Sequence, residues 1–165
     1  LELRVFDHEI GDLIPRGYNS VFKHSDGKVY ATAPFVYSVA DPGKELPVSA
    51  LVSFSADLSL AAKVTLIPAW FPQAMASIGK YLIVLDRGSF DSVVPPALLI
   101  IDPNASPGSS GDQMLLGRID LKELSNGQIT VPRAIASSSS GEVFIDSVGL
   151  LSVVSGIVGG IDIQN

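Results

Sequence analysis

Short apolar runs, separated by turns that contain glycine, recur along the chain, and the clearest set lies between Phe71 and Leu121. Two apolar runs joined at a glycine turn, here Gly79, are typical of a β-hairpin. The third run is apolar without a break, which indicates a strand covered on both faces. We therefore predict four antiparallel strands, the content of one blade of a β-propeller. The four predicted strands are residues 71–77, 80–86, 97–102 and 115–121.

The same pattern flanks this unit on both sides. Upstream, a predicted hairpin at residues 19–30 turns at Asp26-Gly27 and precedes strands at 51–55 and 63–67. Downstream, a hairpin at 131–146 turns at Gly141 and precedes strands at 150–154 and 160–163. At the start, Leu1–Asp7 alternates apolar and polar residues, and with Ile10–Ile14 it resembles the last two strands of a blade. We expect one all-β domain over residues 1–165, with a half blade at 1–14 and blades at about 15–67, 68–124 and 125–165.

The units resemble the repeats of YVTN/NHL-like β-propellers. The segment from Ala134-Ile135-Ala136-Ser137 through Gly141 to Val143-Phe144-Ile145-Asp146 is similar to the first half of that repeat, and Leu99–Asp102 to its third strand. The resemblance implies a β-propeller-like fold of about three and a half four-stranded antiparallel blades, and it implies little about chemistry. A β-sandwich or barrel is the alternative, because other all-β proteins also contain hairpins with glycine turns.

The remaining segments are predicted to connect strands. Residues 34–47, 87–96 and 103–113 are expected to be long loops, and Ile119–Leu124 is too short to be favoured as a helix over a strand. The single tryptophan, Trp70, lies between two predicted blades. We expect it to pack between them, and a surface position as a ligand platform is the alternative.

Composition limits the possible partners and locations. Apolar residues make up 47% of the chain and charged residues 17%, as in a packed globular protein. The formal charge of −6 argues against nucleic acid or an anionic membrane surface as the main partner. Without cysteine the chain has no disulfides or thiolate metal sites. The richest apolar segment, Val148–Ile163, is interrupted by serines and glycines and is not expected to span a membrane. Richness in Ala, Ser, Val and Pro with few lysines slightly favours an extracytoplasmic or secreted location.

Aspartates at strand ends are the most regular candidate site. Asp86 and Asp146 each end the second strand of a repeat, and in a propeller we expect equivalent positions to lie at equivalent heights. Carboxylates converging there would suit Ca²⁺, although Thr32 lies near the corresponding position of the first full unit. The alternative is that each aspartate ends its strand by accepting hydrogen bonds from turn amides.

Other polar groups are less regular. Asp86, Arg87 and Asp91 form a charged group beside a predicted loop, either a site for a polar ligand or a surface ion pair. His8 and His24 are expected to be solvated turn residues, since neither has a second histidine at a spacing that forms a metal pair. The candidate ligand-binding residues are Asp86, Arg87, Asp91, Asp146 and Trp70, and the candidate metal ligands are Asp86 and Asp146.

Three functional hypotheses follow. The first is a non-enzymatic binding or scaffold module that recognises a protein or a small ligand through its loops. The second is a metal-dependent enzyme of the lactonase or hydrolase type seen among similar propellers. The third is a piece of a larger propeller without independent function, since the chain begins with Leu1 and its first strands resemble the end of a blade. Three and a half blades would leave open sheet edges. We therefore expect either self-association or a missing remainder of the chain.

Overall fold

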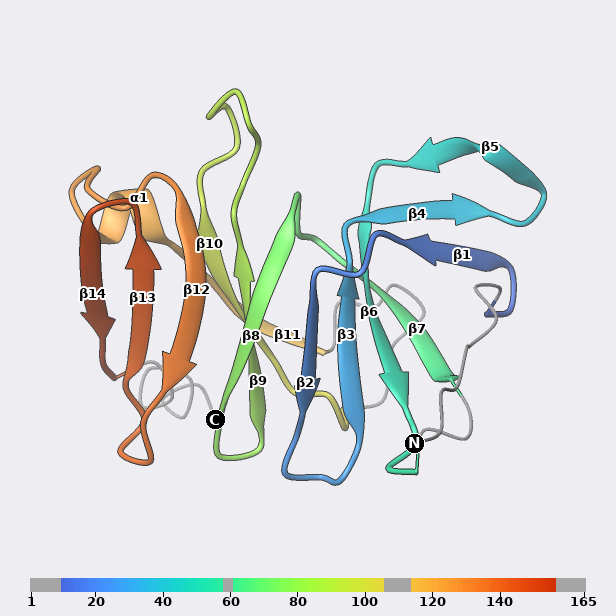
Figure 1. Ribbon diagram of the computed structural model, residues 1–165, viewed down its shortest axis with the longest axis horizontal. Helices are drawn as coiled ribbons and strands as arrows, with labels where there is room; N and C mark the ends of the chain where they lie inside the picture. The colour runs from blue at the N-terminus through green and yellow to red at the C-terminus, as the bar shows by residue number, and fades with distance from the viewer. Residues whose placement is uncertain (1–9, 58–60, 106–113, 157–165) are drawn as a thin grey trace, which may run out of the picture.

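The computed structural model describes residues 10–57, 61–105 and 114–156 of the chain. In this part the fold is all-β, with four antiparallel sheets and one short helix (Figure 1). The first sheet contains β2 (Ser20–Lys23), β3 (Val29–Ala33), β6 (Ser49–Phe54) and β7 (Ala61–Ile67). The second sheet contains β8 (Pro72–Ile78), β9 (Tyr81–Asp86), β10 (Ala97–Ile101) and β11 (Leu115–Asp120). The third sheet contains β12 (Pro132–Ser137), β13 (Val143–Ser147) and β14 (Leu150–Val154), and the insertion sheet contains β1 (Leu13–Arg16), β4 (Phe35–Ser38) and β5 (Asp41–Leu46).

The three predicted hairpins are confirmed. Residues 19–30, 71–86 and 131–146 each form two paired antiparallel strands, with Gly27, Gly79 and Gly141 in the turns at positive φ. Glycine adopts this backbone conformation without the penalty that a Cβ brings. The predicted third and fourth strands of the first two units are also present, as is the third strand of the last unit. The predicted strands at residues 1–7 and 160–163 lie outside the described residues.

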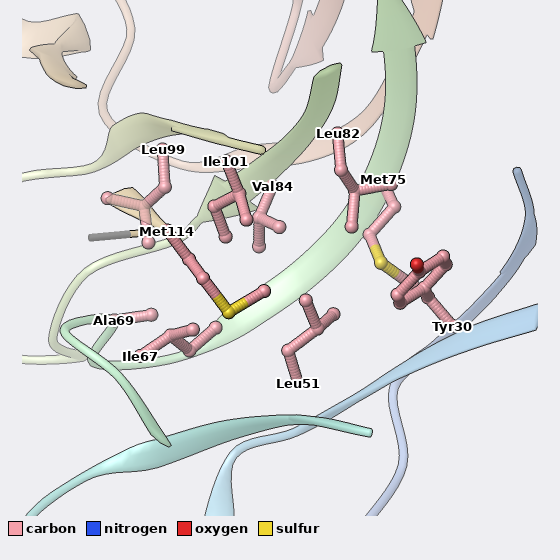
Figure 2. Packing of buried hydrophobic residues seen from close by; sticks show 10 residues of the cluster. All are labelled: Tyr30, Leu51, Ile67, Ala69, Met75, Leu82, Val84, Leu99, Ile101 and Met114. Carbon is pink, nitrogen blue, oxygen red and sulfur yellow. The ribbon is translucent and has the colours of Figure 1, made fainter. Parts of the chain in front are cut away.

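The first, second and third sheets stack face to face in the order of the chain. The core between the first and second sheets (Figure 2) contains ten buried residues, and Met75 of β8 lies beside Tyr30 of β3. A second core joins the second and third sheets and includes Ile83, Leu98 and Ile145. Because the second sheet is covered on both faces, every residue of β10 is buried, which explains its unbroken apolar run. The first strands of the three sheets, β2, β8 and β12, lie side by side.

The sequence pattern predicted a long loop at residues 34–47, and this prediction is wrong. These residues contain β4 and β5, which form a hairpin that joins β1 in the insertion sheet. The residues Asp41, Pro42 and Gly43 are unfavourable in a central strand, but β5 is an exposed edge strand, where Pro is tolerated. The hairpin projects beyond the end of the first sheet (Figure 1).

Two further local predictions are wrong. Residues 10–14 do not form one strand: Ile10 and Leu13 exchange backbone hydrogen bonds across a tight turn, and β1 then pairs with the inserted hairpin rather than with one of the other three sheets. Residues 119–124 do not continue as a strand, because β11 ends at Asp120 and the helix α1 (Leu121–Leu124) follows. The Asp120 carboxylate accepts a hydrogen bond from the Glu123 amide at 2.9 Å, which caps this helix. No helix in the described part of the chain is long and apolar enough to cross a membrane.

Candidate ligand cleft

An open cleft of about 510 Å³ lies where segments from the first and second sheets meet. Its walls come from the connections before β6, between β7 and β8, and between β9 and β10, together with the end of β9 and the middle of β11. The inserted hairpin and the loop after β9 project from this end of the sheets (Figure 1). The cleft is lined by Pro47, Val48, Ile67, Pro68, Ala69, Trp70, Asp86, Val94, Pro95 and Arg118. Two of the predicted ligand-binding residues, Trp70 and Asp86, therefore lie together in one cleft.

Asp86 is the structural centre of this region. It is the last residue of β9, it is fully buried, and its two oxygens accept four hydrogen bonds. The donors are the amides of Trp70 (3.0 Å), Phe71 (2.8 Å) and Gly88 (3.0 Å) and the guanidinium of Arg118 (3.3 Å). A buried carboxylate is tolerated only when it is paired and hydrogen-bonded in this way. Asp86 thus joins the segment before β8, the loop after β9, and β11.

Arg118 was not predicted from the sequence. It lies in β11, 32 positions from Asp86, and its side chain is about one-third exposed. Besides Asp86 it donates to the carbonyl oxygens of Pro68 (3.2 Å) and Pro95 (3.4 Å), which also line the cleft. No local pattern marks this arginine, because its partners come together only when the sheet forms. Three of its five N–H groups make these hydrogen bonds to described residues.

The first prediction for Trp70, that it packs between two neighbouring units, is wrong. The residue is 56% exposed, while its backbone is held by the Asp86 carboxylate and by the Ser49 hydroxyl, which donates to the Trp70 carbonyl at 3.4 Å. The amide of Trp70 is therefore fixed and its side chain remains accessible on the cleft wall. This placement agrees with the surface position of the second prediction, and a role as a ligand platform stays a prediction.

The loop after β9 is ordered by its own side chains. The Ser89 hydroxyl accepts from the Val94 amide at 2.8 Å and donates to Asp91, whose carboxylate also accepts from the Val93 amide at 3.1 Å. Those hydrogen bonds, first from Ser89 and then from Val93, lower the pKa of Asp91 below its ordinary value. Gly88 starts this loop at φ +76°, where a Cβ would lie 2.2 Å from the Val94 carbonyl oxygen. Only glycine fits there.

The predicted charged group of Asp86, Arg87 and Asp91 is separated in the structure. Asp86 points inward to Arg118, and Asp91 bonds within its own loop. The Arg87 guanidinium instead lies over the exposed ring of Phe90, 4.5 Å from its centroid. Phe90 in turn makes an edge-on contact with Phe71, with ring centroids 5.3 Å apart. Arg87 therefore extends an aromatic surface beside the cleft.

Asp86 and Asp146 are not equivalent in register, contrary to the sequence-based expectation. Asp86 pairs with Pro72 and Ala97, and the residue in the same position of the third sheet is Ser147, which pairs with Pro132 and Leu150. Asp146 is one residue earlier, so its side chain points to the opposite face and is exposed. Among the described residues, no three His, Cys, Asp or Glu side chains gather as they would to hold a metal ion. Ca²⁺ binding by Asp86 and Asp146 thus stays a prediction from sequence alone.

A second polar cluster lies at the opposite end of the first sheet, and the sequence did not reveal it. His24, expected to be solvated, is buried, and its Nδ1 lies 3.2 Å from Asp26 Oδ1. The Tyr30 hydroxyl donates to Asp26 Oδ2 at 2.7 Å. Burial alone would raise the pKa of Asp26, but hydrogen bonds from Tyr30 and Lys28 and the adjacent His24 lower it overall. Burial, and then the bond to Asp26, raise the pKa of Tyr30. His8 lies outside the described residues.

No protein-family model matches this chain, and no curated protein matches it either. The cleft must therefore be interpreted from its own geometry.

Proposed function

We propose that this chain is a propeller-like binding module whose ligand site is the cleft beside Trp70 and Arg118. The propeller interpretation is supported by three consecutive antiparallel sheets that stack face to face with their first strands side by side. Such sheets present connecting segments at their ends, where propellers commonly bind ligands. The module is proposed to be non-enzymatic, because its ordered polar groups hold loops in place.

The observation that carries the proposal is the position of Trp70. Its side chain is more than half exposed on the wall of a cleft whose backbone is held by the ion pair between the buried Asp86 carboxylate and the partly exposed Arg118 guanidinium. An exposed aromatic ring on a rigid frame provides binding area at little entropic cost. The three prolines of the cleft, Pro47, Pro68 and Pro95, add rigid apolar walls.

The chemistry of the walls indicates a ligand class. Most lining residues are apolar, and the one cation among them is Arg118, already paired with Asp86. Its two remaining N–H groups suit a hydrogen-bond acceptor such as a carboxylate, without requiring a highly charged ligand. The proposed ligand is therefore a flat, largely apolar small molecule or side chain that carries one carboxylate. It stacks on Trp70 and accepts hydrogen bonds from Arg118.

The proposal is tested with indole-3-acetate and benzoate as probes, followed by amide and indole chemical shifts. We expect saturable shifts at Ala69, Trp70 and Arg118, and at least a tenfold weaker affinity after Trp70→Ala, consistent with the loss of one aromatic contact of about 1.4 kcal/mol. The matched control is Phe90→Ala, which removes another exposed aromatic ring outside the cleft lining and should leave affinity unchanged. Shifts that map elsewhere, or equal affinity in Trp70→Ala, contradict the proposal.

A further inference from the structure

The outer faces of the first and third sheets expose apolar side chains. The residues at the corresponding positions of the neighbouring sheets are buried between sheets. On the third sheet, Leu151 and Val153 of β14 are 70% and 54% exposed. On the first sheet, Val21 of β2 is 70% exposed. The pairing of the strands identifies the counterpart of each residue in the neighbouring sheets.

The outer face of the third sheet has apolar residues at positions that are buried in the second sheet. The last row of the ladder between the second and third strands is Asp86–Ala97 in the second sheet and Ser147–Leu150 in the third. Counting from this row, Leu151 takes the place of Leu98, and Val153 takes that of Ile100. Leu98 and Ile100 are 0% and 3% exposed, because the third sheet packs over them. The third sheet therefore has apolar residues at the same positions, but its face with Leu151 and Val153 is exposed.

The first sheet carries the complementary face. The last row of its corresponding ladder is Ala33–Ala50, and two residues back Ala31 pairs with Val21. In the second and third sheets, the residues that pair two positions before the last row are Met75 and Ile135, so these two residues correspond to Val21. Both of these side chains belong to the cores between sheets. Farther out on this face Ile10 packs near Ala31, Val52 and Phe54, so β2 is the part that stays open.

We propose that a second copy of this chain joins these two faces, so that the third sheet of one copy docks on β2 of the other. The contact would place Leu151 and Val153 of β14 against Val21 of β2, because the rest of the outer face of the first sheet is already buried, with Ile10 packed against it. One chain carries both of these surfaces, and two copies arranged head to tail therefore form the contact twice. Head-to-tail contacts that close give rings, and two copies make the smallest one.

The charges on the two faces also complement each other. Asp146 pairs with Leu151 in register and shares its exposed face, while Lys23 shares the exposed face of β2 with Val21. Opposite charges across an interface fix its orientation and disfavour other pairings. Two third sheets facing each other would instead bring two Asp146 side chains to one interface, and the one cation of this sheet, the exposed Arg133, lies on β12 rather than on β13 or β14. Head-to-tail docking is therefore favoured over contact between two third sheets.

Light scattering after size exclusion of the full chain tests this inference, with far-UV circular dichroism to confirm folding. We expect a dimer, and Leu151→Arg or Val21→Arg should each reduce the mass to that of the monomer. Mixing the two variants should restore a dimer held by one intact contact, because β14 of the Val21→Arg chain meets β2 of the Leu151→Arg chain. Val93→Arg, at a 77% exposed loop position on neither face, should keep the wild-type mass.

Three results would overturn the inference. One is a wild-type monomer at all concentrations, and another is an assembly that Val21→Arg leaves intact, which would indicate contact between third sheets. The third is failure of the mixed, folded variants to associate. The substitutions lie outside the cleft, so probe binding at Trp70 can be measured in each variant and the ligand proposal fails or survives separately.

Discussion

Asp86 and Arg118 form an ion pair at 3.3 Å in which the carboxylate is fully buried and the guanidinium is about one-third exposed. The pair is asymmetric, because Asp86 also accepts three backbone amide hydrogen bonds, whereas Arg118 also donates to two carbonyl oxygens at the solvent edge. Replacing the carboxylate by an amide keeps one acceptor oxygen and turns an NH2 group toward donors that the second oxygen had bound. Removing the guanidinium leaves a carboxylate that keeps three donors.

Asp86→Asn is therefore expected to cost more stability than Arg118→Met. Breaking a buried pair by removing the buried partner costs about 3–5 kcal/mol, while loss of the partly exposed guanidinium should cost about 1–3 kcal/mol. Urea unfolding followed by Trp70 fluorescence measures both. Asp146→Asn, at an exposed aspartate, is the control and should change the free energy of unfolding by less than about 0.5 kcal/mol. Equal costs for Asp86→Asn and Asp146→Asn would refute the structural role of Asp86.

Gly88→Ala is expected to destabilise the protein by more than its backbone conformation alone explains. The new Cβ would meet the Val94 carbonyl oxygen at 2.2 Å, so the loop after β9 must move. Gly149→Ala is the matched control, because Gly149 has a similar φ of +72° and nothing within 4 Å of a Cβ. The control should cost about 1–2 kcal/mol from left-handed geometry, and Gly88→Ala clearly more. Thermal unfolding compares the two variants, and similar losses would mean that the loop yields freely.

The hairpins and the buried strand β10 show which features of the fold the sequence predicts. The hairpins were predictable because their signal is local: a glycine at positive φ between two apolar runs specifies the turn and the pairing of its neighbours. The burial of β10 was also predictable, since a strand covered on both faces needs apolar residues throughout. Most strands of the three stacked sheets are therefore predictable from short segments of the chain.

The candidate site was only partly predictable. Trp70 and Asp86 stood out by residue type and position, but their relation to Arg118 depends on the pairing of β9, β10 and β11. The supposed equivalence of Asp86 and Asp146 failed by one residue, and in a strand one residue reverses the face. The insertion sheet was missed because β5 contains residues of low strand propensity and is held as an exposed edge by β4.

The cluster of Asp26 and Tyr30 predicts loss of stability at both ends of the pH range. Because the pKa of Asp26 is lowered in the folded protein, its contribution to the free energy of unfolding is complete at neutral pH. This contribution is lost as the pH falls below about 4 and past the lowered pKa of the folded state. The raised pKa of Tyr30 means that its contribution is complete below about pH 10 and is lost as pH rises above it, because the unfolded chain releases the proton first.

Tyr30→Phe should therefore lower the free energy of unfolding at neutral pH by about 1–3 kcal/mol, since Asp26 loses a donor. It should also flatten the decline above about pH 10. Urea unfolding at a series of pH values measures both effects. Tyr37→Phe is the control, because the Tyr37 hydroxyl makes an exposed 3.5 Å contact with Glu45. If the alkaline decline of Tyr30→Phe matched that of the wild type, another group would be responsible.

The register that relates the second and third sheets predicts opposite results for two leucines in equivalent positions. Leu98 is fully buried between these sheets, whereas Leu151 is 70% exposed. Leu98→Ala should cost about 2–5 kcal/mol, because it removes buried methyl groups and leaves a cavity. Leu151→Ala should change the free energy of unfolding by less than about 0.5 kcal/mol in the monomer. Both are measured by urea unfolding in a Val21→Arg background, where association through β2 is blocked. A large loss for Leu151→Ala in that background would show that residues of its own chain cover this face, and the proposed docking of a second copy there would then be wrong.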